Sequence, residues 1–340
     1  MTRTFTMPFR PLGASGHSVS AFGLGGWNTF GTKLRTVREV GAVIRAALDS
    51  GINLFDTADS YAGGECERLM GQALHGTDRS KWVLCTKVFF PLNPGSTESG
   101  LSKQHILASI DASLQRLNVD YVDVYFCHRP DPNTPLAETI QTMHDLVRVG
   151  KIRCWGTSEW SPRRIRAAWG IAKQLGLEGP KVEQPQYSLL TRGNFERRIA
   201  PCLRYHGMAA MVWSPLASGV LTGKYDNDLP LGSRLEQIGW LREEILSARS
   251  LEQVRRMKTT ATATGCSRAE LALAYLLACS SVSSVLLGAS SVDQLQSNLG
   301  ALRVDMTEDL KAQLRALFKV PVTETIKVFL RSIFRREQIV

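Results

Sequence analysis

The sequence predicts a single α/β domain, a (β/α)₈ TIM barrel, and three observations lead to that fold class. The chain has 340 residues, of which 44% are hydrophobic, so it can bury a full core. Eight short apolar or β-branched runs alternate with amphipathic helical patterns, and eight parallel strands close a barrel. A doubly wound sheet, the competing fold, is expected to carry a Gly-x-Gly-x-x-Gly motif after an early strand. Gly23-Leu24-Gly25-Gly26 does not match that motif.

The predicted strands recur along the chain, and a helical pattern follows each of them. The strands are expected at 20–24, 52–55, 82–87, 121–127, 152–157, 181–184, 209–213 and 284–288. The helices are expected at 36–50, 65–75, 102–117, 135–149, 161–175, 195–206, 247–264, 267–279 and 291–301. Thr36 and Ser102 stand where the first and third helices begin, as capping residues do.

Two segments do not fit the simple repeat. Residues 7–19 contain Gly13-Ala14-Ser15-Gly16 between polar and apolar residues, which predicts an N-terminal β-hairpin before the barrel. Residues 214–246 form a long connection after the seventh strand, rich in Gly, Pro and Asp. Loops of that length are usually functional, and we expect this one to cover a cofactor. We therefore expect one barrel domain over residues 1–320, followed by a tail at 321–340.

The tail has the pattern of a basic amphipathic helix. Its apolar residues recur at i, i+3, i+4, i+7 and i+8, namely Ile326, Phe329, Leu330, Ile333 and Phe334. Such a helix can lie on an anionic membrane surface. Packing on the barrel or on a neighbouring subunit is the interpretation that we favour.

Composition and spacing argue against several other classes. The net charge is +10, but the basic residues are dispersed, which argues against nucleic-acid binding. The longest uncharged apolar stretch, 271–279, has nine residues, so we expect no transmembrane segment. The seven cysteines have no zinc spacing, so we expect no metal. The start of the chain lacks an apolar signal core, and a cytoplasmic location fits best.

Four polar residues stand at or soon after the carboxyl ends of neighbouring predicted strands. Asp56 ends the second strand, Tyr61 follows it in the next loop, Lys87 ends the third strand and His128 follows the fourth. Taken singly, each residue is more simply explained as a capping residue of a turn or as a solvent-exposed residue. In a barrel these strand ends meet at one mouth, where active sites lie. The sequence therefore predicts a carboxylate, a phenol, an ammonium and an imidazole in one place.

That combination suits the reduction of a carbonyl group. An ammonium beside a phenol favours the phenolate and lowers the phenol pKa, and Asp56 would keep Lys87 charged and oriented. His128 would donate a hydrogen bond to the carbonyl oxygen. Side chains cannot supply a hydride, so a nicotinamide cofactor is implied.

Ordered motifs over residues 8–305 resemble the aldo-keto reductase family. The strongest is Gly51-Ile52-Asn53-Leu54-Phe55-Asp56-Thr57-Ala58-Asp59-Ser60-Tyr61. Thr86-Lys87 and His128 match two further catalytic positions of that family. The resemblance is greatest to the branch of voltage-gated potassium channel β subunits and their microbial and fungal enzyme relatives. That match is carried by 121–124, 129–132, 155–158, 213–216 and 284–290.

The resemblance implies site residues, a cofactor and an oligomeric state. Asp56, Tyr61, Lys87 and His128 would be the catalytic residues, NADP(H) the cofactor and a homo-tetramer the assembly. Tyr187 would stack under the nicotinamide only if the wider family's aromatic partner is shared; in the channel-subunit branch Trp213 is the expected neighbour. The implied cofactor contacts are Gly26, Trp27, Asp56, Ser158, Gln184, Trp213, Ser214, Pro215, Leu216, Ser218, Gly219, Lys224, Arg234, Gly288, Ser290, Gln294 and Asn298.

The substrate pocket and the departures from the branch complete the prediction. Aromatic residues near strand ends predict an apolar pocket for a small-molecule carbonyl substrate, lined by Trp27, Tyr61, Phe89, His128 and Trp160. Channel subunits commonly have asparagine at the position of His128, which favours a working NADP-dependent reductase. They have arginine at the position of Glu159 and glutamate at that of Ser297. The alternative is a channel-β-subunit-like regulatory protein that binds NADP(H) and senses redox state.

Overall fold

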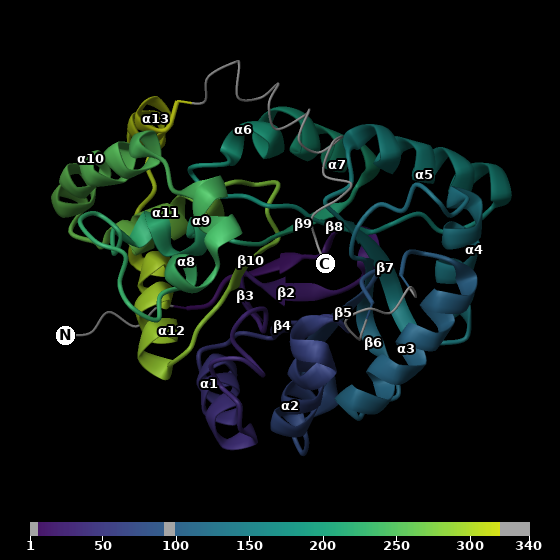
Figure 1. Ribbon diagram of the computed structural model, residues 1–340. Coiled ribbons are helices and arrows are strands. Elements are labelled where there is room, and N and C mark those ends of the chain that lie inside the picture. Colours follow the sequence, from purple (N-terminus) through teal and green to yellow (C-terminus); the bar gives the residue numbers. More distant parts are fainter. Residues whose placement is uncertain (1–5, 92–98, 320–340) are drawn as a thin grey trace.

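The computed structural model describes residues 6–91 and 99–319, and it confirms the predicted eight-stranded barrel (Figure 1). The strands pair in parallel in the closed order β10-β3-β4-β5-β6-β7-β8-β9. Their bounds are β3 (Phe22–Gly25), β4 (Leu54–Asp56), β5 (Val83–Val88), β6 (Val122–Cys127), β7 (Ile152–Ser158), β8 (Val182–Gln184), β9 (Ala209–Val212) and β10 (Ser284–Leu287). All eight predicted strands are present, with ends displaced by two residues at most.

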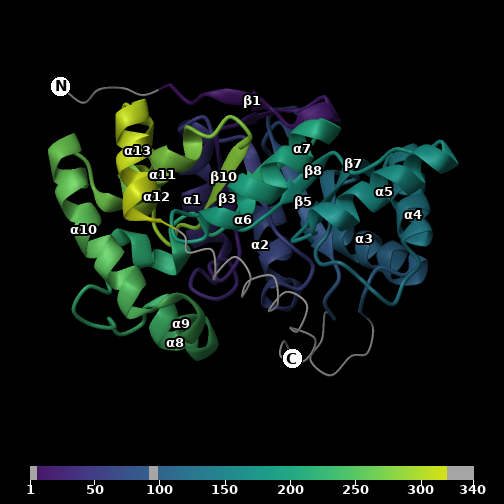
Figure 2. The same cartoon turned by 90° about the horizontal axis from the view of Figure 1, so that it is seen from above.

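The predicted hairpin is also present and closes the amino-terminal end of the barrel. Strands β1 (Phe9–Pro11) and β2 (Ser18–Ser20) pair antiparallel. Leu12 and Val19 join the inner core of the barrel, which includes Leu54, Val124 and Phe126. Figure 2 shows β1 and the pair α8 (Arg234–Gln237) and α9 (Gly239–Ile245) at opposite ends of the molecule. The mouth at the carboxyl ends of the strands is therefore the end over which a site can be built.

One glycine allows the hairpin to approach the barrel closely. Gly13 has φ +56°, and a Cβ atom there would lie 2.7 Å from the backbone nitrogen of Ala209. Arg10 fastens the hairpin by donating to the carbonyl oxygens of Leu277 and Val282, both at 2.7 Å.

The outer helices pack a second, larger core against the barrel. They are α1 (Val37–Asp49), α2 (Glu65–Leu74), α3 (Lys103–Leu117), α4 (Leu136–Arg148), α5 (Pro162–Leu175), α7 (Ala200–His206), α10 (Ala248–Thr264), α11 (Arg268–Leu277) and α12 (Val292–Leu299). The predicted caps are present: Thr36 and Glu39 form a capping box, and Ser102 accepts from the amide of His105. Five of the seven cysteines are buried, and none forms a disulfide.

Three parts of the fold differ from the sequence prediction. The long connection contains α8 and α9, which are too short to show a clear period in the sequence. The predicted helix at 195–206 is interrupted: α6 (Arg192–Asn194) and a π-helical turn, Phe195–Ile199, precede α7. A final helix, α13 (Glu308–Leu317), was not predicted, although Thr307 caps it and Leu310 and Leu314 bury one face. The predicted tail helix at 321–340 lies outside the described residues.

The described part of the chain contains no helix long and apolar enough to cross a membrane. Within residues 6–91 and 99–319, no group of three or more His, Cys, Asp or Glu side chains could hold a metal ion.

Candidate active site

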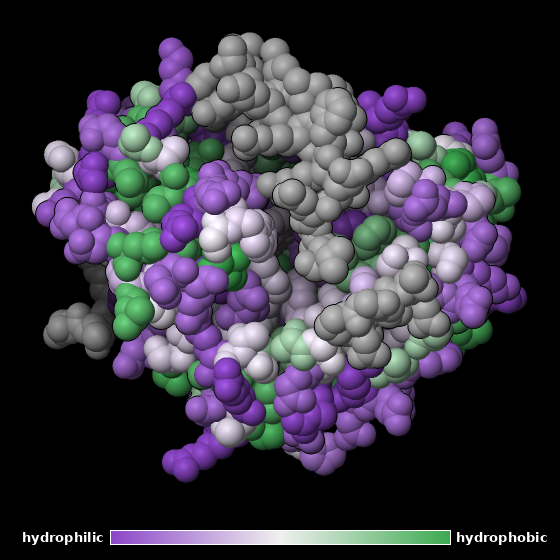
Figure 3. Space-filling model, viewed as in Figure 1, coloured by the Kyte–Doolittle hydropathy of each residue, from purple (hydrophilic) through white to green (hydrophobic). Residues whose placement is uncertain are grey.

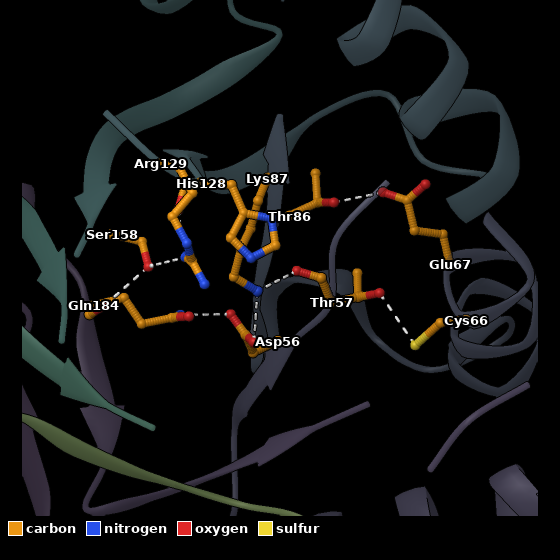
Figure 4. A network of polar contacts seen from close by, with 10 residues as sticks. All are labelled: Asp56, Thr57, Cys66, Glu67, Thr86, Lys87, His128, Arg129, Ser158 and Gln184. Carbon is orange, nitrogen blue, oxygen red and sulfur yellow. Dashed lines mark hydrogen bonds and ion pairs between the residues drawn. The ribbon is translucent and has the colours of Figure 1, made fainter. Parts of the chain in front are cut away.

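The four residues predicted from the strand ends come together at the mouth of the barrel. Asp56 ends β4, Lys87 lies in β5, His128 follows β6, and Tyr61 opens the turn after β4. The Lys87 Nζ atom is 2.7 Å from Asp56 Oδ2 and 4.7 Å from the centre of the Tyr61 ring. The rings of Tyr61 and His128 meet edge to face, with centroids 5.6 Å apart. Figure 4 shows Asp56, Lys87 and His128 converging from three strands.

The ion pair at the centre of this group is buried. Lys87 is 0% exposed and Asp56 is 3% exposed. Lys87 also donates to the backbone carbonyl of Thr57, and Gln184 donates to Asp56 Oδ1 at 2.8 Å. Burial alone would lower the pKa of Lys87, but attraction by Asp56 and Tyr61 raises it above its ordinary value. Lys87 is therefore a fixed positive charge beside Tyr61.

The proton affinities of Tyr61 and His128 follow from burial as well as from charge. Burial raises the pKa of the Tyr61 phenol, and Lys87 opposes that rise without cancelling it. The ammonium does lower this pKa, as the sequence predicts, but burial, which the sequence does not show, outweighs its effect. Burial, Arg129 and Lys87 together hold the pKa of His128 well below its usual range. At neutral pH the site holds a protonated phenol and a neutral imidazole.

Two predicted cofactor contacts lie directly beside this group. Ser158 ends β7 and donates to the carbonyl oxygen of Gln184, which ends β8, at 3.0 Å. Because Gln184 also holds Asp56, the two polar side chains share one side of the ion pair (Figure 4).

Tryptophans and one glutamate form part of the rim. Trp27 and Trp213 meet edge to face with centroids 6.2 Å apart, and the Arg234 guanidinium lies 5.4 Å from the Trp27 ring. Glu159, at φ +59°, accepts from the indole of Trp213 at 3.0 Å and from the amide of Gln186 at 2.6 Å. Glu159, which stands where the channel β subunits have arginine, therefore positions Trp213.

Three cations converge over the mouth. A Cβ atom placed on Gly288 would lie 3.9 Å from Nη2 of Arg234, and one on Gly219 would lie 2.8 Å from Nζ of Lys224. Lys33 is the third cation. Burial lowers the pKa of its ammonium, and the nearby charges of Arg234 and Lys224 lower it further. Sequence reasoning missed Lys33, because it stands in the loop after the first strand and only the fold brings it to 224 and 234.

The connection after β9 has an unusual backbone. Ser214, Ala217 and Ser218 have φ between +47° and +56°, and Gly219 has φ +92°. Such conformations in residues other than glycine are costly and concentrate at functional sites. The Ser218 hydroxyl is buried without a partner in the described structure, which leaves it available to a ligand. Pro215 and Leu216 lie within the same turn.

The remaining predicted contacts lie just before α12 and along it. Ser290 donates from its amide and its hydroxyl to Gln294 Oε1, at 2.8 and 3.1 Å. Asn298 lies one turn further along the same helix and is 5% exposed.

The predicted aromatic pocket needs two corrections. Phe90, not Phe89, packs its ring on His128, with centroids 5.1 Å apart, and Phe89 packs behind it at 5.2 Å. Trp160 is 1% exposed and belongs to the main core, so the structure does not support its place in a substrate pocket. Trp27 and Tyr61 do lie at the mouth.

Tyr187 is likewise unavailable as a stacking partner. Its ring is 1% exposed and packs against Phe195, and its hydroxyl donates to Glu196 at 2.9 Å.

Comparison with known proteins agrees with the barrel fold and shows the family. The profile of the Aldo/keto reductase family matches residues 21–319. A probable voltage-gated potassium channel subunit beta from Arabidopsis thaliana is 43% identical over 303 residues, covering 88% of this chain and 92% of that protein. A putative voltage-gated potassium channel subunit beta from Schizosaccharomyces pombe is 43% identical over 305 residues, covering 87% and 88%. The chain belongs to the aldo/keto reductase family.

Proposed function

We propose that the protein reduces aldehydes or ketones to alcohols with NADPH, and that Tyr61 is the general acid. The family is one of NAD(P)-dependent oxidoreductases. The observation that supports carbonyl reduction with Tyr61 as the acid is the contact of Lys87 with both Asp56 and the Tyr61 ring, next to a neutral His128. This arrangement can deliver a proton to a carbonyl oxygen.

The residues around the mouth fit a dinucleotide phosphate. Lys33, Lys224 and Arg234 concentrate positive charge there, as a 2′-phosphate requires. The Ser218 hydroxyl and the left-handed backbone at 217–219 would face the pyrophosphate. Ser158 and Gln184 would hold the carboxamide, and Gln294 and Asn298 the adenosine end. When bound, the reduced dinucleotide supplies the hydride that no side chain can supply.

The side chains then divide the work of proton transfer. His128 donates one N–H to the carbonyl oxygen and fixes its position. As the carbonyl carbon gains a hydride, Tyr61 gives its proton to that oxygen, and the carbonyl becomes an alcohol. Lys87 stabilises the phenolate that Tyr61 becomes, and Asp56 holds Lys87 in place. Solvent then returns a proton to Tyr61.

Replacement of Tyr61 by phenylalanine tests this proposal. The change keeps the ring and removes the acidic hydroxyl. Since general acid catalysis contributes about 10²–10⁴-fold, aldehyde reduction should fall by at least about that factor. NADPH affinity, measured by fluorescence titration, should stay within about threefold. A variant that reduces a good aldehyde near the parent rate would show that the proton comes from another group.

A second function is favoured by the names of the relatives, which are given as channel β subunits. In that case the chain would bind NADP(H), sense redox state and regulate a partner protein. A panel of aldehydes with NADPH, followed by absorbance of the reduced nicotinamide, separates the two. Steady turnover supports the reductase, and tight binding without turnover supports the regulator. A cytoplasmic location and a homo-tetramer remain further proposals of ours.

A further inference from the structure

Arg129 places a second positive charge in the active site, apart from the Lys87–Asp56 pair. It directly follows His128, two residues after the end of β6. Its Nη1 donates to the carbonyl oxygen of His128 at 2.6 Å and to Ser158 Oγ at 3.4 Å. Figure 4 shows the guanidinium between His128 and Ser158. It acts on the reacting groups, since it contributes to the lowered pKa of His128 and opposes the raised pKa of Tyr61.

This guanidinium has no acidic partner among residues 6–91 and 99–319. Four partly buried arginines pair with carboxylates at 2.5 to 2.7 Å: Arg79 with Asp123, Arg116 with Glu67, Arg192 with Glu196, and Arg268 with Asp226. Arg10 and Arg164 donate to backbone carbonyl oxygens instead, but neither lies beside the catalytic group.

The acids nearest to Arg129 in the sequence and in the site are already engaged. Asp131 accepts from the amides of Leu101 and Asn133 and from the hydroxyl of Thr134. Asp56 is occupied by Lys87 and Gln184. A half-buried charge without a counter-ion is costly unless a ligand supplies one.

We propose that Arg129 binds an anionic group of the carbonyl substrate, a carboxylate or a phosphate. The preferred substrates would then be aldehydes or ketones that carry a negative charge near the carbonyl. This inference rests on the proposed reductase function, because the same mouth must hold the carbonyl group beside Tyr61.

The surroundings of Arg129 suit such a substrate. Phe90 lies against both His128 and Arg129, with its ring 5.1 Å from the imidazole and 5.6 Å from the guanidinium carbon. It provides an apolar wall for the carbon skeleton between the carbonyl and the charge. Only Nη1 has acceptors in the described structure, so Nε and Nη2 keep N–H groups for an oxyanion. A guanidinium can hold such a group with two parallel hydrogen bonds.

Paired substrates test the inference. The pairs are 4-carboxybenzaldehyde against methyl 4-formylbenzoate, and 4-formylphenyl phosphate against 4-methoxybenzaldehyde. Each pair keeps the aromatic aldehyde and changes the charge. We expect the parent to favour one or both anions by about 10- to 100-fold in kcat/KM, mainly through KM, because a hydrogen bond to a charged group has about that effect. The pair with the larger ratio identifies the anion.

Substitutions at Arg129 assign that preference to its side chain. Arg129→Gln should abolish it, so that kcat/KM falls about 10- to 100-fold more for the anionic member of each pair than for the neutral one. Arg129→Lys should keep part of it. Arg153→Gln is the matched control, because it removes an equal charge from an exposed side chain that stacks on Tyr121 at the start of β6. It should leave the preference unchanged.

Three results would overturn the inference. The first is turnover of neutral aldehydes by the parent without preference for either anion, which leaves the proposed reductase function standing. The second is an equal loss on charged and neutral substrates in Arg129→Gln together with weaker NADPH binding, which would assign Arg129 to the cofactor.

The third result comes from a binding measurement that needs no turnover. It can therefore be made even if no aldehyde is reduced, an outcome that would refute the proposed reductase function but not the anion site. The alcohols 4-(hydroxymethyl)benzoate and benzyl alcohol can be titrated against the parent with NADP⁺, using tryptophan fluorescence. Tighter binding of the benzoate in the parent, lost in Arg129→Gln, supports the anion site. Equal binding of the two alcohols refutes it.

Discussion

Replacing Lys87 by methionine should damage both catalysis and stability, and the two effects can be separated. The side chain is 0% exposed, and its ammonium contacts Asp56 Oδ2 at 2.7 Å and the carbonyl of Thr57. Methionine removes the charge and leaves Asp56 buried, with Gln184 as its remaining side-chain donor. Removing one partner of a buried ion pair costs about 3–5 kcal/mol in the free energy of unfolding.

The catalytic effect has a different cause. Tyr61 loses the ammonium that opposes the rise of its pKa, so its proton becomes harder to give up. We expect kcat/KM for an aldehyde to fall by about 10²–10⁴-fold, as for loss of general acid catalysis. Urea denaturation measures stability, and loss of reduced-nicotinamide absorbance measures the rate.

The double variant Lys87→Met/Asp56→Asn is the control. It removes both buried charges, so most of the lost stability should return. Activity should stay low, because Tyr61 still lacks a cation. If Lys87→Met reduces aldehydes within threefold of the parent rate, the mechanism is wrong. If the double variant is no more stable than the single one, our account of the buried pair is wrong.

Three further predictions concern the cofactor, pH and the hairpin. Arg234→Ala should weaken NADPH binding by about 10- to 100-fold and NADH binding less, in fluorescence titrations; equal affinity of the parent for both cofactors would contradict this. Burial raises the pKa of Glu183 to about 8, so the folded state holds a proton there that the unfolded state loses near pH 4.5. Stability from this group should therefore fall as pH rises from about 5 to 8, and denaturation of Glu183→Gln should show a smaller fall. Gly16→Ala, at φ +81° with no atom within 4 Å, should cost about 1–2 kcal/mol from backbone strain alone. Gly13→Ala should cost clearly more than Gly16→Ala, because its Cβ would also meet the backbone of Ala209; equal melting curves of the two variants would refute the close approach.

The order of strands and the four central residues could be predicted because both depend on local sequence. Apolar runs end at Asp56, Lys87 and His128, and the parallel arrangement then brings those ends together. Helix α13 could have been predicted from the Thr307 cap and its leucine period, since these signals are also local.

Other features depend on tertiary packing and could not be predicted. The choice between Phe89 and Phe90, the burial of Trp160 and the approach of Lys33 to Arg234 follow from how loops settle on the barrel. The direction of the Tyr61 pKa shift depends on the balance between burial and the nearby charges, of which Lys87 has the largest effect. A sequence shows the charge but not the burial.

Figure 3 shows the face of the molecule on which α8 and α9 lie, and among the residues drawn in colour hydrophilic ones predominate, with smaller apolar patches between them.

The burial of the cysteines lowers the reactivity of their thiols toward electrophiles. Burial raises the pKa of the Cys66 and Cys154 thiols to about 12, and it moves those of Cys85 and Cys127 in the same direction. At pH 7 a thiol with a pKa of about 12 is ionised in on the order of one molecule in 10⁵. The thiolate is the form that electrophiles attack. If the protein reduces aldehydes as proposed, these four buried sulfur atoms are held in a form that such electrophiles attack only slowly.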